Sequence, residues 1–317
     1  MMRVVEYDRY GGSDVLVLRP AALPRPGAGQ VLVRVRAAAL NPKDVIARSG
    51  RLLIFRVLAG GRFPKRVGFD WSGEALALGP GVTGIREGDA LYGMINAWSA
   101  GACATHALVS VKELAPRPAS LSWEEAAAVP LAAQTALQAL RDVARLERGQ
   151  RVLVNGASGG VGTFAVQIAR ALGARVTAVT SARNTARMRE LGADDVLDYT
   201  TTDLRAAAGV HDVFFDVFGN RSLSFARPLL SARGTYVSTL PKGQVFRDVV
   251  LTALRGKRAR LVSVRSRAAD LVLLAEWIDK GAVRPVVDRV FPLEEIAAAE
   301  DYLGTRRARG KVVLRVD

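Results

Sequence analysis

The chain has 317 residues, of which 50% are hydrophobic and 24% are charged, a composition typical of a soluble globular enzyme with one large or two moderate domains. A single cysteine, Cys103, excludes intramolecular disulfides and cysteine-rich metal sites. The formal net charge of +15 is spread along the chain, and aromatic residues make up only 6% of it. This pattern argues against a nucleic-acid-binding protein, which gathers its positive charge beside stacking aromatic side chains.

Membrane insertion and secretion are not expected either. No apolar run is long enough to cross a bilayer, and residues 1–7 lack the apolar segment of a secretory signal. We therefore expect a cytoplasmic protein whose positive charge is solvated surface that attracts anionic cofactors.

The first part of the chain predicts β-structure. Residues 31–36 alternate apolar and basic side chains, as a half-exposed strand does, and further strand-like segments cover 72–78 and 107–111. These segments predict a compact antiparallel or barrel-like domain. A capping box at 122–125 then opens a helix, and Pro130 restarts it.

Strands and helices alternate regularly from residue 151 onward, which predicts a doubly wound parallel sheet of the Rossmann type. The predicted strands are 151–155, 175–180, 195–198, 212–217, 234–239 and 260–264. The end of the chain, with strands at 283–291 and 311–316 around a helix at 293–303, does not continue the alternation. We therefore expect an α/β protein with a β-rich domain of residues 1–118 and 281–317 and a dinucleotide-binding domain of residues 119–280.

The segment Arg151–Gly162 is an apolar strand that runs into four glycines, and an apolar helix follows it. The spacing Gly156-x-x-Gly159-x-x-Gly162 is a variant of the dinucleotide-binding fingerprint. Glycines allow a ligand to approach the backbone, and the unpaired N–H groups and positive dipole end of the helix favour a pyrophosphate. This segment predicts the phosphate site of a dinucleotide.

The next strand indicates which dinucleotide binds. A site that prefers NAD usually has an acidic residue at the end of this strand, which accepts from the ribose 2′-OH. Here the strand ends at Thr180-Ser181, with Arg183 and Arg187 after it. Hydroxyl and guanidinium groups suit a 2′-phosphate, so the sequence predicts NADPH. In the alternative interpretation, both arginines only face solvent.

The same glycine turn also fits the nucleophile elbow of α/β-hydrolases, with Ser158 as nucleophile. The only later histidine, His211, precedes a strand instead of following one. It would therefore lie at the opposite edge of the sheet from Ser158, where it cannot act as the base. We interpret Ser158 as a phosphate donor.

Taken together, the motifs resemble the medium-chain dehydrogenase/reductase superfamily, in its zinc-independent quinone oxidoreductase branch (the relatives of zeta-crystallin). The motifs that carry the resemblance are Ala39-Leu-Asn-Pro-Lys-Asp44, Gly68-Phe-Asp-Trp-Ser-Gly-Glu74, Leu121-Ser-Trp-Glu-Glu-Ala-Ala-Ala-Val-Pro-Leu131, the glycine turn, Leu191-Gly-Ala-Asp-Asp-Val-Leu-Asp-Tyr199 and Ala308-Arg-Gly-Lys-Val-Val313. The resemblance implies a GroES-like β-rich domain beside the Rossmann domain.

The resemblance also implies that zinc is absent. Alcohol dehydrogenases have a cysteine where this chain has Asn41, and Gly-His-Glu where it has Gly68-Phe69-Asp70. Tetrahedral zinc sites need sulfur and imidazole ligands, which these positions do not supply. Without zinc as a Lewis acid, the acceptor must be intrinsically electrophilic.

By position, the resemblance assigns cofactor contacts and a tentative acceptor pocket. The cofactor contacts are Asn41, Thr135, Gly156, Ser158, Gly159, Gly160, Val161, Ser181, Arg183, Tyr199, Phe218, Thr239 and Leu240. The acceptor pocket consists of Asn41, Ile46 and Cys103, and no general acid is visible among them.

Some of these residues have structural interpretations as well. Asn41 is placed to cap the helix that Pro42 opens. Asp44 and Arg48, four residues apart, are placed to form a helix-surface ion pair.

The sequence therefore predicts an NADPH-dependent enzyme that transfers hydride to a quinone or an activated enone. One alternative is a reductase of enoyl thioesters or 2-alkenals, which shares fold and cofactor. A second is a nucleic-acid-binding protein that retains a cofactor pocket. The resemblance further implies a homodimer that pairs the strand at 260–264 of two subunits.

Overall fold

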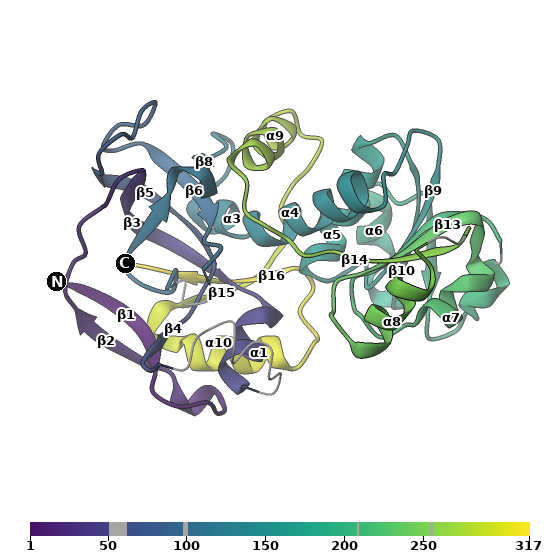
Figure 1. Ribbon diagram of the computed structural model, residues 1–317, viewed down its shortest axis with the longest axis horizontal. Helices are drawn as coiled ribbons and strands as arrows, with labels where there is room; N and C mark the ends of the chain where they lie inside the picture. Colours follow the sequence, from purple (N-terminus) through teal and green to yellow (C-terminus); the bar gives the residue numbers. More distant parts are fainter. Residues whose placement is uncertain (51–61, 98–100, 208, 254–255) are drawn as a thin grey trace. The chain divides into compact units, whose positions relative to one another are not determined.

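The computed structural model describes residues 1–50, 62–97, 101–207, 209–253 and 256–317. Two compact units make up the chain (Figure 1). The first comprises residues 1–131, 266–279 and 285–317, and the second comprises residues 132–265 and 280–284. Residues 119–131 and 266–279 thus group with the first unit, which differs from the predicted domain of residues 119–280. In the described part of the chain, no helix has the length and apolar character needed to cross a membrane.

The first unit is built on two sheets. One has the strand order β2-β1-β4, and the other has the order β15-β16-β3-β5-β6-β8, with β7 also paired to β3. The strands are β1 (Met2–Tyr7), β2 (Val17–Ala21), β3 (Gln30–Leu40), β4 (Lys65–Arg66), β5 (Asp70–Leu78), β6 (Ala90–Met94), β7 (His106–Ser110), β8 (Leu114–Pro116), β15 (Val287–Pro292) and β16 (Lys311–Arg315). All pairs are antiparallel except β15 with β16, as the sequence predicts for the first domain.

Helices and short turns complete the first unit. They are η1 (Ser13–Val15), α1 (Pro42–Ser49), η2 (Val111–Glu113), α3 (Trp123–Ala127), α9 (Ala268–Asp279), η7 (Leu293–Glu295) and α10 (Ile296–Gly304). The Ser122–Glu125 capping box opens α3 as predicted. α9 belongs to this unit because it packs on β8, and the Tyr92 hydroxyl donates to the carbonyl of Leu271 at 2.6 Å.

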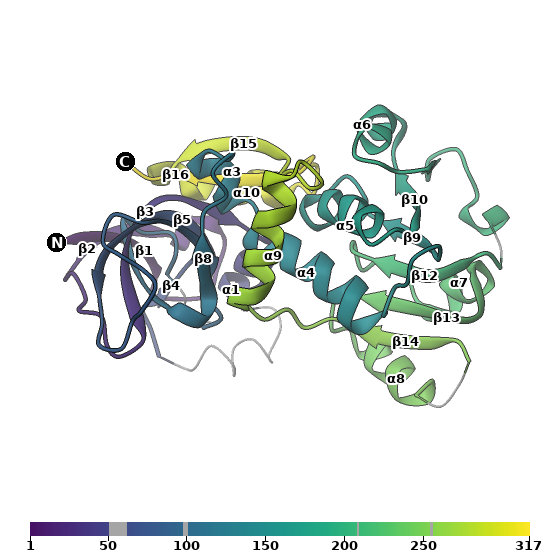
Figure 2. The same cartoon turned by 90° about the horizontal axis from the view of Figure 1, so that it is seen from above.

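The second unit contains one parallel sheet of six strands in the order β11-β10-β9-β12-β13-β14. Strands β9, β12, β13 and β14 follow one another in Figure 2. The strands are β9 (Arg151–Asn155), β10 (Arg175–Thr180), β11 (Asp195–Asp198), β12 (His211–Asp216), β13 (Leu230–Ser238) and β14 (Arg258–Leu261). The remaining elements are α4 (Pro130–Leu137), η3 (Gln138–Val143), α5 (Gly160–Ala171), η4 (Ala182–Asn184), α6 (Thr185–Glu190), η5 (Leu204–Ala207), α7 (Leu223–Ala226), η6 (Arg227–Leu229) and α8 (Gly243–Leu251).

The central strands of this sheet are apolar along most of their length because helices cover the sheet. Leu153, Phe214 and Tyr236, on three neighbouring strands, are completely buried in one core cluster. The order reverses between β9 and β12, and ligands of doubly wound sheets bind at the carboxyl ends of the strands beside such a reversal. The glycine turn lies at this point, directly after β9.

Candidate functional site: a dinucleotide turn and a buried ionic network

The glycine turn connects β9 to α5. Gly156 has φ +83°, a conformation that side-chain-bearing residues rarely adopt. At Gly162, a Cβ atom would lie 2.2 Å from the carbonyl oxygen of Gly156, so the first turn of α5 packs directly on the loop. These two glycines are required by the fold of the turn itself.

Gly159 is different, because a Cβ atom there would meet nothing nearer than 3.6 Å. It is the N-cap of α5, and no side chain caps this helix end. Ser158, Gly159, Gly160 and Val161 are all partly exposed. A partly exposed helix N-terminus without a side-chain cap fits a pyrophosphate, whose oxygens would accept from the backbone N–H groups.

The end of β10 carries the residues assigned to the 2′-phosphate. Asn184 is buried and donates through Nδ2 to Thr180 Oγ1 at 3.2 Å and to Ser181 Oγ at 3.3 Å, which fixes both hydroxyls. Arg183 is exposed, in the short turn η4. The structure therefore brings Ser181 and Arg183 together at the carboxyl edge of the sheet. Tyr199 is also near, because its N–H donates to the Thr180 carbonyl at 3.1 Å, and its side chain is 55% exposed.

An acidic side chain also lies at this edge, which sequence reasoning missed. Asp198 is paired with Thr180 in the β10–β11 ladder. Hydrogen bonds from Thr200, and one from the backbone of Ala182, lower the pKa of Asp198, so its carboxylate is ionised. β10 ends without an acidic residue, but Asp198 at the end of the neighbouring strand β11 contributes one negative charge.

Asp216 organises the loop that follows β12. This completely buried carboxylate accepts from the backbone N–H groups of Gly219 and Arg221, both at 2.9 Å. It also accepts from Asn155 Nδ2 at 2.8 Å and from the Tyr236 hydroxyl at 3.1 Å. The carboxylate therefore determines the course of the loop at 217–221, which carries Phe218.

The remaining predicted contacts of the second unit lie around this loop. Phe218 is 44% exposed, and a Cβ atom on Gly156 would touch it at 3.0 Å, so it lies against the glycine turn. Thr239 Oγ1 donates to the Val217 carbonyl at 2.9 Å, and Leu240 packs on Gly219. Thr135 is buried in α4.

The hydrolase alternative fails on the position of His211. This residue begins β12 and is paired with Leu230, whereas the other end of β12 is paired with Asn155, directly before the glycine turn. His211 is buried, with Nε2 3.3 Å from Thr177 Oγ1. It lies at the opposite edge of the sheet from Ser158, as predicted.

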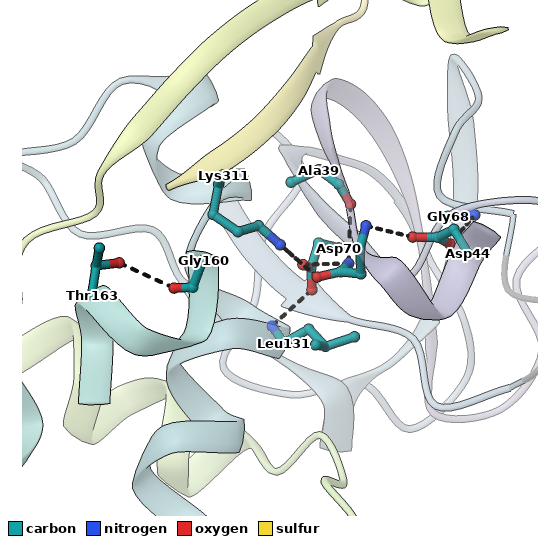
Figure 3. A network of polar contacts seen from close by, with 9 residues as sticks. Ala39, Asp44, Gly68, Asp70, Leu131, Gly160, Thr163 and Lys311 are labelled. Atoms are coloured by element: carbon teal, nitrogen blue, oxygen red, sulfur yellow. Dashed lines mark hydrogen bonds and ion pairs between the residues drawn. The ribbon is translucent and has the colours of Figure 1, made fainter. Parts of the chain in front are cut away.

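The first unit contains a buried ionic network around Asp70 (Figure 3). Lys311 Nζ donates to Asn41 Oδ1 at 2.6 Å and to Asp70 Oδ2 at 3.0 Å. Asn41 Nδ2 donates to the same Asp70 oxygen at 3.0 Å, and the N–H of Leu131 donates to the other at 2.8 Å. Asn41, Asp70 and Lys311 are each at most 4% exposed. The network joins the end of β3, the start of β5 and the start of β16.

Asp44 holds the backbone beside this network. Its carboxylate accepts from the N–H of Asn41 at 2.8 Å and from the N–H of Gly68 at 3.2 Å. Burial, followed by the nearby Glu300 carboxylate, raises the pKa of Asp44 to about 7. Asn41 is the N-cap of α1, as predicted.

The predicted surface ion pair of Asp44 with Arg48 is wrong. Arg48 Nε donates to Glu300 Oε2 at 2.6 Å, and its NH1 group donates to the Gly11 carbonyl at 2.6 Å. Both partners of the ion pair are buried. Arg48 faces inward because α10 packs on α1, an arrangement that the sequence of α1 alone does not reveal.

Of the tentative acceptor residues, Ile46 is partly exposed on α1. Cys103 is completely buried in the apolar core of the first unit, and burial raises the pKa of its thiol. Because Cys103 has no exposed surface, we omit it from the proposed pocket.

Lys43 is a further residue that sequence reasoning missed. Its Nζ lies 3.8 Å from the centre of the Phe69 ring, and burial lowers its pKa. A cation in the first turn of a helix is opposed by the helix dipole. The unfavourable position of Lys43 in the sequence could therefore have indicated a functional role.

Zinc does not fit the residues of this network. At the two positions where the family resemblance would put zinc ligands, Asn41 and Phe69 offer an amide and a phenyl ring. The ammonium group of Lys311 already lies between Asn41 and Asp70 and would repel a divalent cation. Among the described residues, no cluster of histidine, cysteine and acidic side chains could hold a metal ion.

Family models match both parts of the chain. The alcohol dehydrogenase GroES-like domain matches residues 27–122, and a zinc-binding dehydrogenase model matches residues 191–314. The mitochondrial NAD(P)H oxidoreductase RTN4IP1 of Danio rerio is 33% identical over 98% of this chain and 90% of its own length. The 2-methylene-furan-3-one reductase of Solanum lycopersicum is 32% identical over 99% of this chain and 79% of its own length.

Solved structures agree with the predicted fold. The quinone oxidoreductase from Coxiella burnetii has a TM-score of 0.91 at 30% identity and covers 100% of this chain and 99% of its own. Mycobacterial Rv1454c complexed with NADPH has a TM-score of 0.83 at 27% identity and covers 99% and 100% of the two chains. These matches confirm the α/β fold with a Rossmann sheet and a GroES-like domain.

Proposed function

Because the chain belongs to the quinone oxidoreductase branch of the medium-chain dehydrogenase/reductase superfamily, we propose that it is an NADPH-dependent reductase of quinones or conjugated enones. The observation that carries this proposal is the partly exposed N-terminus of α5 at Gly159, which no side chain caps. When bound there, NADPH supplies the hydride for the reduction. The chain supplies the binding groups and their orientation.

The preference for NADPH rests on Ser181 and Arg183. The Ser181 hydroxyl is held by Asn184, and the exposed guanidinium of Arg183 can bind a 2′-phosphate bidentately. Arg183→Ala should weaken NADPH binding about tenfold or more and leave NADH binding unchanged, since a charged hydrogen bond contributes about 1.5–3 kcal/mol. Arg189→Ala, which removes an exposed arginine of α6, is the control. An unchanged preference in Arg183→Ala would show that the phosphate site is misplaced.

We also propose that the enzyme works without zinc. The support is the donor set at Asn41, Phe69 and Lys311, which suits no tetrahedral zinc site. The acceptor must then be electrophilic by itself, which quinones and enones are. Purified enzyme should contain less than stoichiometric metal by elemental analysis and keep its turnover after treatment with a chelator. Loss of turnover that zinc restores would refute this proposal.

The class of acceptor can be decided by measuring NADPH oxidation with a panel of quinones, enones, 2-alkenals and acyl thioesters. We expect oxidation of NADPH with quinones or enones, and slower oxidation with NADH. A relative of this chain is a 2-methylene-furan-3-one reductase, which supports the enone. Turnover confined to 2-alkenals or acyl thioesters would instead establish the alternative reductase.

A homodimer is proposed from the exposed edge of the second unit. β14 is the last strand of its sheet, and α8 beside it exposes Phe246 (48%), Val250 (75%) and Leu251 (57%). An unpaired edge strand next to exposed apolar side chains is typical of an interface. Light scattering should give the mass of a dimer, and Leu251→Glu should shift it toward a monomer. A monomeric wild-type protein would contradict the proposal. The cytoplasmic location stays a prediction, since one relative named above is mitochondrial.

A further inference from the structure

Lys43 lies at the edge of the buried network of the first unit. It occupies the first turn of α1, two residues after Asn41. Its Nζ lies 3.8 Å from the centre of the Phe69 ring, and Phe69 directly precedes Asp70 in the chain. The ammonium group is therefore held over an aromatic face close in the chain to Asn41, which the family resemblance assigns to the cofactor.

Accessibility separates Lys43 from the other ionisable groups in its surroundings. Asp44, Asp70, Cys103 and Lys311 are all buried, with at most 4% of any of them exposed. Lys43, which lies among these four residues, is partly exposed. It can thus meet a substrate, whereas the buried groups cannot.

The electrostatics of the site make Lys43 a better acid than a surface lysine. Burial is the largest influence and lowers its pKa, while the carboxylates of Asp44 and Asp70 oppose this change. Lys311 pairs with Asp70, and the pKa of Asp44, raised to about 7, leaves its carboxyl group partly protonated near neutral pH. Both opposing charges are therefore weakened. A lysine with a lowered pKa is the kind of group that enzymes use as a general acid near neutral pH.

We propose that Lys43 is the proton donor of the reaction, an inference that rests on the proposed function. Hydride addition to the β-carbon of an enone moves the C=C electron pair toward the carbonyl group and leaves an enolate. Nζ of Lys43 gives its proton to this enolate, and the saturated ketone is released. The neutral amine then recovers a proton from water, so that the sum is one enone, one NADPH and one proton converted to the saturated ketone and NADP⁺.

This role predicts that Lys43 matters more for enones than for quinones. A hydroquinone anion is protonated on oxygen, a transfer that is fast from water. The saturated ketone forms only when the enolate is protonated on carbon, which is slower and gains more from a positioned donor. Lys43 thus supplies the general acid that the sequence did not reveal.

The test compares two substitutions. Lys43→Met keeps the length and apolar stem over Phe69 but removes the proton, and should lower kcat with an enone by about a hundredfold, a typical contribution of a general acid. Lys43→Arg keeps the charge, but a guanidinium is a much weaker acid than an ammonium group, so kcat should stay low. NADPH affinity, measured by fluorescence titration, should be unchanged in both. Lys112→Met, at an exposed lysine of the same unit, is the control.

A second readout does not depend on turnover. NMR titration of the lysine side chains, with the Lys43 signal assigned by its loss in Lys43→Arg, should give Lys43 a pKa below that of Lys112. The wild-type kcat with an enone should fall as pH rises through the Lys43 value, and Lys43→Met should lack this limb.

The outcomes separate this inference from the proposed function. An absence of NADPH oxidation by the wild-type protein would refute the function. An active wild type with unchanged kcat and pH profile in Lys43→Met would overturn only the role of Lys43. Full recovery in Lys43→Arg would show that charge and not proton transfer is required, and weaker NADPH binding with normal kcat would make Lys43 a cofactor anchor. Either result overturns the inference.

Discussion

Lys311 and Asp70, 241 positions apart in the chain, form a buried ion pair with 3.0 Å between Nζ and Oδ2. The same ammonium group donates to Asn41, so one lysine of β16 fixes the start of β5 and the end of β3. A buried charge is tolerated only when its partners are in place. The orientation of Asn41 therefore depends on a residue from the far end of the chain.

Removing this lysine should destabilise the protein. Lys311→Met leaves the Asp70 carboxylate buried without its cation, and we expect a loss of about 3–5 kcal/mol in the free energy of unfolding. Urea denaturation measures the effect, with Lys112→Met as control. Adding Asp70→Asn to Lys311→Met should recover part of the loss. Simple additivity of the two single changes would contradict the network.

The glycine turn offers a matched pair of substitutions. Gly162→Ala places a Cβ atom 2.2 Å from the Gly156 carbonyl oxygen, so it should lower the melting temperature strongly. Gly159→Ala has its nearest contact at 3.6 Å and should fold normally. Its methyl group would occupy the space assigned to the pyrophosphate, so NADPH affinity should fall at least about tenfold. Normal NADPH binding by Gly159→Ala would place the cofactor elsewhere.

Asp216 is expected to control the loop that carries Phe218. In Asp216→Asn an amide N–H₂ group must face backbone N–H donors, which should cost about 1–3 kcal/mol of stability. NADPH affinity should fall as well because the loop loses its anchor. Asp212→Asn is the control, since Asp212 lies at the other end of β12 and accepts from Arg151 and Ser231. Isothermal titration calorimetry measures both variants, and equal effects on NADPH affinity would argue against the assignment.

Asp198 should weaken the preference for NADPH. Its carboxylate lies one strand away from Ser181 and is kept ionised by hydrogen bonds from Thr200. Asp198→Asn removes a negative charge near the proposed 2′-phosphate, and NADPH affinity should rise by a factor of about 2–5 at low salt. NADH affinity should stay the same. A parallel change for both cofactors would indicate that Asp198 acts on loop structure.

Asp44 gives the protein a pH-dependent stability. Its pKa is 3.8 in the unfolded chain and about 7 in the folded one, so the folded state binds the proton more tightly. The free energy of unfolding should therefore fall as pH rises from 3.8 to about 7 and level off above this range. Asp44→Asn should reduce this slope, and the raised pKa of Glu300 should leave part of it. Denaturation at a series of pH values tests this, and an unchanged slope would refute it.

Much of the second unit was predictable because its central strands are buried on both faces. The predicted bounds of β9, β10 and β11 agree with the structure. β9 and β10 are largely apolar runs that end at a turn, whereas β11 is a short strand with an aspartate at each end. β13 instead begins at Leu230, four residues before the predicted start, because Ser231, Ala232 and Arg233 include no large apolar side chain and give no strand signal. β14 begins earlier than predicted for the same reason.

The glycine turn and the network around Asp70 also differ in how far the sequence predicts them. The glycine turn is local, and its spacing alone indicated a phosphate site. The pairing of Asn41 with Asp70 and Lys311 joins residues 29 and 270 positions apart, and such contacts leave no periodic pattern in a sequence. Arg48 shows the same limit, because its partner Glu300 is distant and an acidic residue four positions away was the only local candidate.

The strand order of the first unit constrains how the molecule assembles on the ribosome. β16 lies between β15 and β3, so the larger sheet has a gap until residues 311–315 have been synthesised. The sheet of the second unit is drawn from residues 151–261 and is complete earlier. Domains fold as their segments become available. The glycine turn can therefore form on a nascent chain before Lys311, the partner of Asn41, has been synthesised.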